Sequence, residues 1–160
     1  PKPLEGSEFS QTVALNSALF GTGKPVMVIE SVLSMNTVLR NVVLSWNGSV
    51  ESARAISLSI PLIKKAKNVH VFVAGASVKP QVSTAGLIDY LKQHDIPCIS
   101  EHKVQSRKSV GLELLTHAKE IDASLIVMGA YTQNRFQKLI LGGVTEYVLQ
   151  NTKVPIFLVH

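Results

Sequence analysis

Glycines stand on both sides of a polar loop, in a pattern that could hold a phosphate group. Gly129 follows an apolar run, and Gly142 and Gly143 come just before a segment with helical spacing. Arg135 and Lys138 lie between them and add positive charge. Phosphate-binding loops use glycine because the backbone approaches the anion closely, and a helix N-terminus often supplies the N–H groups. The pattern alone is a weak signal, since glycine is common at strand ends and helix starts.

Other side chains near these positions have both a functional and a structural interpretation. Trp46 could form one wall of a base pocket, although core packing is more common for tryptophan. Ser49 could reach a phosphate and Thr145 could donate a hydroxyl group, but each could equally cap a helix. Tyr131 could stack on a ligand or a partner, and Cys98 is typical of a small buried hydrophobic residue. The histidines lack zinc-motif spacing, and the sequence shows no catalytic triad order and no acid–base pair.

The composition indicates a folded globular chain. It has 160 residues, of which 46% are hydrophobic and 17% charged, enough for one domain with a real core. No apolar run approaches the ~20 residues that cross a bilayer. With a single cysteine no internal disulfide can form, so a reducing cytoplasm is the expected location. The net charge of +5 comes from scattered basic residues without interleaved aromatics, so neither nucleic acid nor a membrane is an expected partner.

From residue 41 onward, apolar runs alternate with helical patterns. Runs typical of strands cover residues 42–46, 69–74, 96–104, 124–129 and 154–159, and helical spacing covers 49–67, 81–95, 109–122 and 144–151. This order predicts an α/β fold with a parallel sheet covered on both faces. The continuous apolar run 124–129 should be central, whereas alternation and Pro97 place 96–104 at an edge. Ligands of such sheets bind beyond the C-terminal strand ends, at the switch point of strand order.

Residues 12–29 resemble the C-terminal segment of the same chain in sequence. The segment TGKPVMVI (22–29) parallels TKVPIFLV (152–159), and Leu19 precedes Pro25 by the same six positions that separate Leu149 from Pro155. Spacing and order favour a repeat, although any αβ unit with a Pro-led final strand looks similar. We therefore expect three parts: residues 1–30 as the terminal helix and strand of a preceding repeat, 31–40 as a linker, and 41–160 as a complete domain. The absence of an initial Met is consistent with a fragment or a processed product.

The segment DASLIVMGAYTQNRFQKLILGGVTEYVLQNTKVPIFLV (122–159) strongly resembles the C-terminal signature of the universal stress protein family. In nucleotide-binding members that signature reads Gly-x-x-Gly, nine residues, Gly, then Ser or Thr. The segment VVLSWNGS (42–49) resembles the family's first strand, which ends in an Asp-Gly-Ser-like turn. The resemblance runs from about residue 41 to 160. It implies a three-layer α/β/α, Rossmann-like fold of the adenine nucleotide α-hydrolase type, with five parallel strands in the order 3-2-1-4-5. Residues 12–30 resemble the end of another such domain, as in tandem members.

The chain departs from the family signature at three positions. Gly129 and Gly142 match, but Thr132 replaces the second glycine and Gly143 replaces the Ser or Thr. Asn47 stands where the family has an aspartate on the base or ribose side, and it keeps hydrogen-bonding capacity without the charge. The resemblance thus implies a partly degenerate cleft for ATP or AMP, with Mg²⁺ as an accompanying ion. The expected contacts are Asn47, Gly48, Ser49, Gly129, Ala130, Thr132, Arg135, Gly142, Gly143, Val144 and Thr145.

Three functions are compatible with the sequence. The first is a stress-response or signalling module that holds an adenine nucleotide in this cleft. The second is an interaction protein of the same fold without a nucleotide, forming a homodimer through the apolar edge strand 154–159, as family members often do. The third and least favoured is a slow nucleotide hydrolase, because the loop offers no carboxylate for Mg²⁺ and no clear base.

Overall fold

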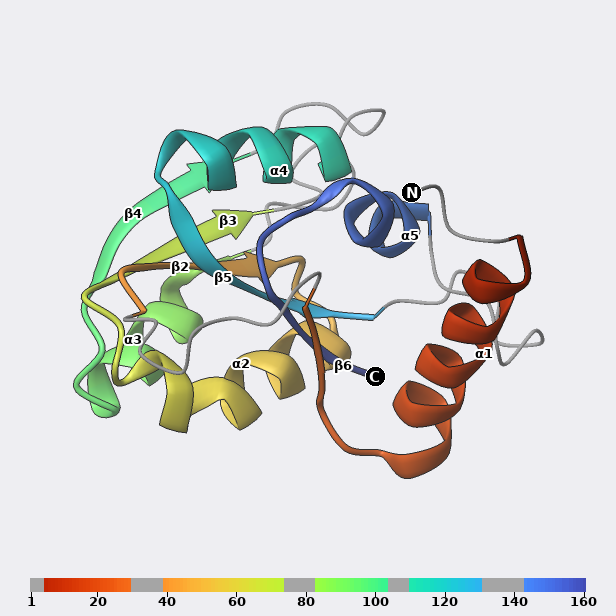
Figure 1. Ribbon diagram of the computed structural model, residues 1–160. Coiled ribbons are helices and arrows are strands. Elements are labelled where there is room, and N and C mark those ends of the chain that lie inside the picture. Colours follow the sequence, from red (N-terminus) through yellow and green to blue (C-terminus); the bar gives the residue numbers. More distant parts are fainter. Residues whose placement is uncertain (1–4, 30–38, 74–82, 104–109, 131–142) are drawn as a thin grey trace.

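Six strands form one sheet in the computed structural model, which describes residues 5–29, 39–73, 83–103, 110–130 and 143–160, with side chains from residue 13 (Figure 1). Their order across the sheet is β1-β6-β5-β2-β3-β4. Strands β2 to β6 run parallel, and β1 pairs antiparallel with β6. The strands are β1 (Val26–Val28), β2 (Asn41–Trp46), β3 (Asn68–Val73), β4 (Cys98–Lys103), β5 (Ala123–Gly129) and β6 (Ile156–Val159).

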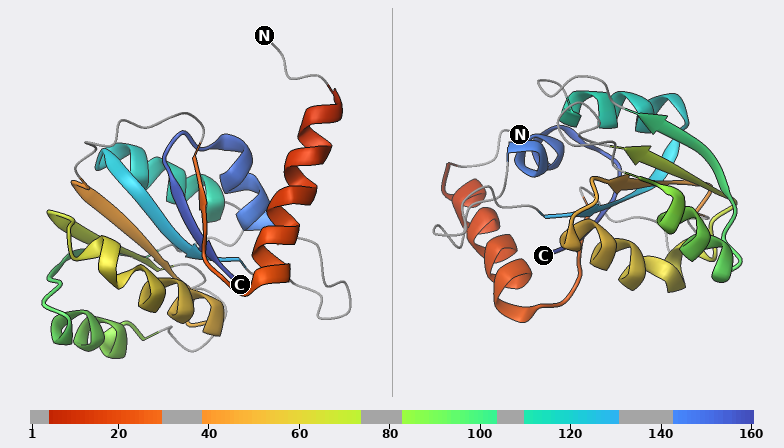
Figure 2. Two further views of the ribbon diagram at one scale, coloured as in Figure 1. Left: turned by 60° about the horizontal axis from the view of Figure 1, so that its bottom comes forward. Right: turned by 180° about the vertical axis from the view of Figure 1, so that it is seen from behind.

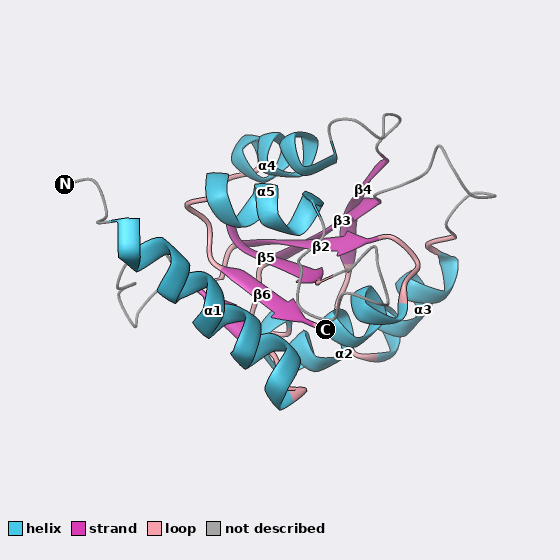
Figure 3. Ribbon diagram, turned by 90° about the vertical axis from the view of Figure 1, so that its right-hand side faces the viewer, coloured by secondary structure: helices cyan, strands magenta, loops and turns pink. Residues whose placement is uncertain are grey.

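Helices cover both faces of the sheet. Helices α2 and α3 lie on one face and α4 and α5 on the other, whereas α1 stands at the end of the sheet formed by β1 and β6 (Figures 1 and 3). The C-terminus lies close to the last turn of α1 in both views of Figure 2. None of the described helices is long and apolar enough to span a bilayer. The helices are α1 (Glu5–Thr22), α2 (Val50–Ile63), α3 (Ala85–Gln93), α4 (Val110–Glu120) and α5 (Gly143–Asn151).

The core has two halves, one on each face of the sheet. Because successive strand residues point to opposite faces, Val42 and Leu44 of β2 pack toward α2 and α3, whereas Val43 packs toward α4 and α5. Burying each such side chain contributes about 1.5–3 kcal/mol, so the central strands hold both helical layers in place. Leu19 of α1 belongs to the same cluster as α4 and α5. The first helix is therefore packed on the domain.

The predicted parallel sheet is confirmed. Strands β4, β3, β2, β5 and β6 follow the expected order 3-2-1-4-5, and β5 is central. Residues of β4 alternate between half-buried and exposed, as expected for the edge position that it occupies. The expectation that the final strand is an exposed edge is wrong, because β1 pairs along it and all four residues of β6 are buried.

Candidate functional site

Strands β2 and β5 are neighbours at the point where strand order reverses. Leu44 pairs with Val127, so Asn47 and Ala130, each three residues further on, leave the sheet side by side. Helix α2 continues from β2 over one face, and α5 continues from β5 over the other. Ligands of open α/β sheets bind at such a point. The two turns that the sequence singled out are thus brought to one edge of the sheet.

Gly129 touches the beginning of α2. A Cβ placed on Gly129 would lie 2.6 Å from the Glu51 carbonyl carbon and 2.6 Å from the Ser52 nitrogen. Contacts below 3.0 Å with rigid backbone atoms do not occur in folded proteins, so only glycine allows this approach. Gly129 therefore serves first to seat the α2 N-terminus against the end of β5.

The turn after β2 is ordered by its own side chains. Asn47 Oδ1 accepts a hydrogen bond from the Ser49 amide at 3.0 Å, and Gly48 has a φ of 72°, which favours glycine. Ser49 Oγ accepts from the Ser52 amide at 3.1 Å and so caps α2. The capping interpretation of Ser49 is confirmed. The Nδ2 group of Asn47 makes no hydrogen bond among the described residues and faces solvent.

The backbone of Ala130 is fully engaged. Its amide donates to the Val159 carbonyl at 2.7 Å, and its carbonyl oxygen lies 3.2 Å from Nδ1 of His160. The ring of His160 in turn meets Phe20 of α1 edge to face, with centroids 4.6 Å apart. In this conformation the Ala130 amide has no spare hydrogen for an anion. It fixes the end of β5 to β6 and, through His160, to α1.

Helix α5 begins at Gly143 in the described part of the chain. It follows β5 and leads back to the parallel strand β6, so its first residue lies on the same sheet edge as the end of β5. Gly143 is exposed and a Cβ there would meet nothing within 4 Å, and Val144 is also exposed. Thr145 is buried as the third residue of α5, so the expectation that it caps this helix is wrong. Five further positions of the predicted loop lie outside the described residues: Tyr131, Thr132, Arg135, Lys138 and Gly142.

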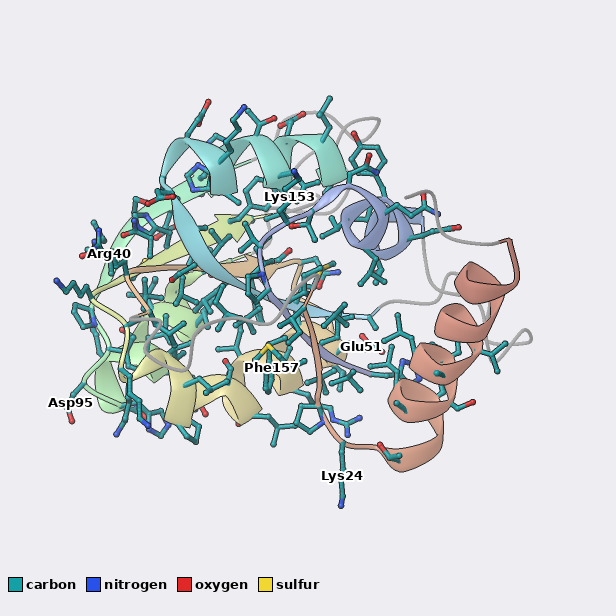
Figure 4. All side chains as sticks on the ribbon, viewed as in Figure 1. Lys24, Arg40, Glu51, Asp95, Lys153 and Phe157 are labelled. Carbon is teal, nitrogen blue, oxygen red and sulfur yellow. The ribbon has the colours of Figure 1, made fainter. Side chains whose placement is uncertain are left out.

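Two residues at this edge were not among the site residues expected from the sequence, although Glu51 was expected to favour the first turn of its helix. Glu51 lies in the first turn of α2 against Gly129, which makes it a carboxylate at the switch point. His160 follows β6 directly and reaches Ala130. Figure 4 shows Glu51 and Phe157 close to the sheet, whereas Lys24 and Asp95 project from the periphery. The position of each residue in the sequence could have indicated it. Glu51 comes two residues after the helix cap Ser49, which follows a strand end, and His160 comes one residue after a strand.

Trp46 packs against the protein core, which is the structural interpretation, and does not form the wall of an open base pocket. It lies half-buried against the cluster under α2 and α3, and its Nε1 donates to the Ser83 carbonyl at 3.1 Å. Next to Ser83, a surface hollow of about 450 Å³ lies between α3 and β4. Its floor includes Thr84, whose hydroxyl donates to Glu101 at 2.8 Å. This hollow lies away from the β2–β5 switch point and holds both acidic and basic side chains.

Histidines form a second concentration of titratable groups, between α4 and the β3–β4 pair. The rings of His102 and His117 are stacked with centroids 4.6 Å apart, and His70 lies 6.3 Å from His117. Burial lowers the pKa of His70 and of His117, and the Nε2 atoms of both have no hydrogen-bond partner in the described part of the chain. Within that part, no group of three or more potential ligands could hold a metal ion.

Comparisons with known proteins agree with this architecture. A family model described as the universal stress protein family matches residues 63–160, more than half of the chain. Stress response protein NhaX of Bacillus subtilis is 39% identical over 46 residues, which are 29% of this chain and 28% of that protein. The matched part thus spans less than a third of this curated relative.

Solved structures show the same fold at low identity. A universal stress protein from Archaeoglobus fulgidus superposes with a TM-score of 0.70 at 18% identity, over 94% of this chain and 56% of its own. Universal stress protein UspA from Lactobacillus plantarum gives 0.58 at 16% identity, over 78% of this chain and all of its own. A universal stress protein solved in complex with cAMP gives 0.56 at 23% identity, over 78% and 98%. This chain spans about half the length of the Archaeoglobus protein.

Proposed function

This chain belongs to the universal stress protein family, and on that premise we propose that it is a stress-response module that holds an adenine nucleotide, ATP or AMP. The nucleotide would lie where β2 and β5 part. One observation carries the proposal: Gly129 at the end of β5 packs directly on the first turn of α2, so the segments that follow β2 and β5 are in contact at the proposed position. A family member of the same fold was solved with cAMP, which supports a nucleotide as the ligand class.

The N-terminus of α2 is the proposed anion-binding element. The first amides of a helix have no partner within it, and the helix dipole favours negative charge there. In α2 the Ser52 amide is already bound by Ser49, whereas no hydrogen bond among the described residues uses the amides of Val50 and Glu51, so we assign these two amides to the ligand. Val50 is among the most exposed of the described apolar residues, at 71%. Gly143 and Val144 face the same edge from α5 and would bind the phosphate from the other side.

The remaining contacts follow from which groups are free. The Asn47 Nδ2 group can donate to a base or ribose oxygen, because only its Oδ1 is used by the turn. Ala130 and Thr145 are not proposed as direct contacts, since one has its backbone engaged and the other is buried. Glu51 brings a negative charge beside the phosphate position. Its carboxylate suits Mg²⁺, which prefers oxygen ligands and commonly accompanies ATP.

Calorimetry of two matched leucine variants tests the proposal. Gly143→Leu adds a side chain at the open start of α5, and Gly86→Leu adds the same side chain at an equally open position in the first turn of α3. The parent chain is titrated with AMP and with Mg-ATP. We expect saturable binding in the micromolar range, weakened at least tenfold by Gly143→Leu and unchanged by Gly86→Leu.

The same titration decides the alternative of an interaction protein without a nucleotide. An absence of heat at millimolar ligand would overturn the nucleotide proposal and favour that alternative. If both leucine variants weakened nucleotide binding equally, the ligand would not lie at the start of α5. Far-UV circular dichroism of each variant confirms that the helices are intact before the titrations are compared.

A further inference from the structure

Three histidine rings fill the contact between α4 and the β3–β4 pair. His117 of α4 stacks on His102 of β4, with planes 17° from parallel and centroids 4.6 Å apart, and His70 of β3 lies 6.3 Å from His117. Phe72 of β3 is fully buried and stacks on His102 at 5.5 Å. We call His70, His102 and His117 the histidine layer. This layer covers Phe72 and forms part of the packing of α4 on the sheet.

The two inner rings of the histidine layer are built to stay neutral. His70 and His117 are each 8% exposed. Nδ1 of His70 lies 2.7 Å from Oγ of Ser100, whereas Nε2 of His70 and Nε2 of His117 have no partner in the described ranges. A neutral imidazole can leave one nitrogen as a bare acceptor, but an imidazolium has two N–H donors that both need acceptors. Protonation would therefore leave a buried donor and a buried charge without a partner.

The charges around His117 favour the same neutral state. Burial has the largest effect on the pKa of His117 and lowers it, and the charges of His102 and His70 lower it further, whereas Glu120 of α4 raises it. Strand β5 carries no titratable residue. Helix α5 meets α4 where Tyr147 packs on Gly111. The other titratable residues of α4 and α5 are Glu113, Lys119, Glu146 and Tyr147.

We propose that the histidine layer is a proton-operated release for α4: when the layer takes up protons, α4 separates from β3 and β4 while the rest of the sheet stays folded. The closed layer excludes protons and the open layer accepts them, so the open form binds more protons and a falling pH favours it. His102 is half-buried and forms the outer side of the layer. A proton on His102 puts a positive charge against the ring of His117, so uptake at one ring strains the contact with the next.

The opening is local because the histidine layer lies on one half of the core. Strands β2, β5 and β6 hold α2 through the apolar cluster on the other face, and that cluster contains no histidine. The remaining histidines, His94 and His160, follow α3 and β6. Strand β4 has a strand neighbour on one side only, within the described sheet. Opening of such a unit costs less free energy than unfolding of the whole domain. The release does not depend on the proposed nucleotide site.

Thiol labelling of two buried positions tests the release. In a Cys98→Ser background, Ala118→Cys places a thiol on α4 beside His117, and Ala55→Cys places one on α2 in the opposite cluster. Both positions are at most 1% exposed. Each variant reacts with a pyridyl disulfide at pH 7.5 and 5.5. Its rate is divided by the rate of the same variant unfolded in urea at the same pH, which removes the intrinsic pH dependence of the thiol.

We expect the labelling ratio of Ala118→Cys to rise as the pH falls from 7.5 to 5.5. The rise should be about tenfold for each histidine that takes up its proton only in the open form, where the ordinary value of 6.5 applies. At pH 5.5 the ratio should exceed that of Ala55→Cys at least tenfold. Low urea should hardly change it but should accelerate labelling of Ala55→Cys, because sensitivity to urea follows the surface that opening exposes.

Replacement of His117 shows whether the histidine layer is responsible. His117→Phe keeps a ring against His102 without a titrating nitrogen, so it should remove most of the rise at Ala118→Cys. If that variant does not fold, His117→Gln, which is neutral at both pH values, should have the same effect. Circular dichroism at pH 5.5 establishes that each variant is folded.

Three results would overturn the proposal. Equal ratios and equal urea dependence at the two thiols would mean that the whole domain unfolds. A ratio at Ala118→Cys that does not change with pH would mean that protons do not open the layer. A full rise that persists in the folded His117 variant would place the proton uptake outside the layer.

Discussion

Gly129 lies so close to the backbone of Glu51 that an added Cβ would be 2.6 Å from the Glu51 carbonyl carbon. Gly129→Ala must therefore push α2 away from β5, and overpacking of this kind costs about 2 kcal/mol. Urea unfolding should show this loss, whereas Gly143→Ala, with open space around it, should stay within about 0.5 kcal/mol of the parent. Equal stability of Gly129→Ala would mean that α2 is not held at this distance.

The cap of α2 can be separated from any role in phosphate binding. Ser49→Ala removes the acceptor of the Ser52 amide, which is 3.1 Å away, and should cost about 1 kcal/mol of unfolding free energy. Ser49→Asp keeps the cap and should restore that stability. Its added charge should nevertheless weaken AMP binding at least tenfold, because it stands beside the proposed phosphate position. Unweakened binding by a stable Ser49→Asp variant would move the phosphate away from α2.

Glu51 leads to a prediction of how nucleotide binding at the proposed site depends on Mg²⁺. Its carboxylate, at the start of α2 beside Gly129, repels a bound phosphate when no cation is present. In EDTA, Glu51→Gln should therefore strengthen AMP binding by about threefold to tenfold. Glu120→Gln makes the same charge change at the end of α4, which leads into the opposite end of β5, and should have no effect. Weaker AMP binding by Glu51→Gln would show that the side chain contacts the nucleotide directly.

The stacked histidines predict the pH dependence of stability. Burial lowers the pKa of His117, as do the charges of His102 and His70, whereas Glu120 acts in the opposite direction. Because the pKa in the folded protein lies below the ordinary 6.5, the unfolded chain binds more protons as the pH falls through about 6.5. The free energy of unfolding should therefore decrease from pH 7.5 to 5.5. Urea titrations should show a weaker decrease for His117→Phe, and an equal decrease in this variant would contradict the prediction.

The contact between Phe20 and His160 predicts how firmly α1 is held. Their rings meet edge to face at 4.6 Å, and such pairs contribute about 0.5–1.5 kcal/mol beyond the area they bury. A double-mutant cycle of Phe20→Ala and His160→Ala should show coupling of about 1 kcal/mol in thermal or urea unfolding. His160→Phe keeps the ring contact but loses the hydrogen bond to Ala130, so it should retain most of the coupling with Phe20. If the losses of unfolding free energy in the two single variants simply add up in the double variant, the contact does not exist in solution.

The sequence predicted the parallel sheet because burial leaves a direct mark on strand composition. The uninterrupted apolar run of β5 reflects burial on both faces, and the alternation in β4 reflects an edge. The adjacency of Asn47 and Gly129 did not follow from composition, since strand order came from the family resemblance. Nor could the sequence show that the Ala130 amide is already used, because its partner Val159 lies on a strand that is distant in the chain.

Sequence patterns could not predict where β1 lies in the sheet. A strand of three residues carries too little periodicity to identify its partner, and this partner lies at the other end of the chain. The repeated Thr-to-Pro spacing was a usable signal, but it indicated likeness and not contact. Sequence patterns also could not predict packing distances, such as that between Gly129 and Glu51, because these distances depend on how the layers of the fold assemble.

The pairing of β1 with β6 also shapes how the sheet assembles during folding. Among the described strands, β1 comes first along the sequence and β6 comes last, yet the two are partners. Contacts between residues so distant in sequence form slowly, so we expect β1 to join the sheet after the strands between them. Until then Val26 and Val28 lack the apolar cluster on which they pack, and unpaired apolar strands are sites of aggregation. The charge of Lys24, which projects into solvent two residues before β1, opposes such association.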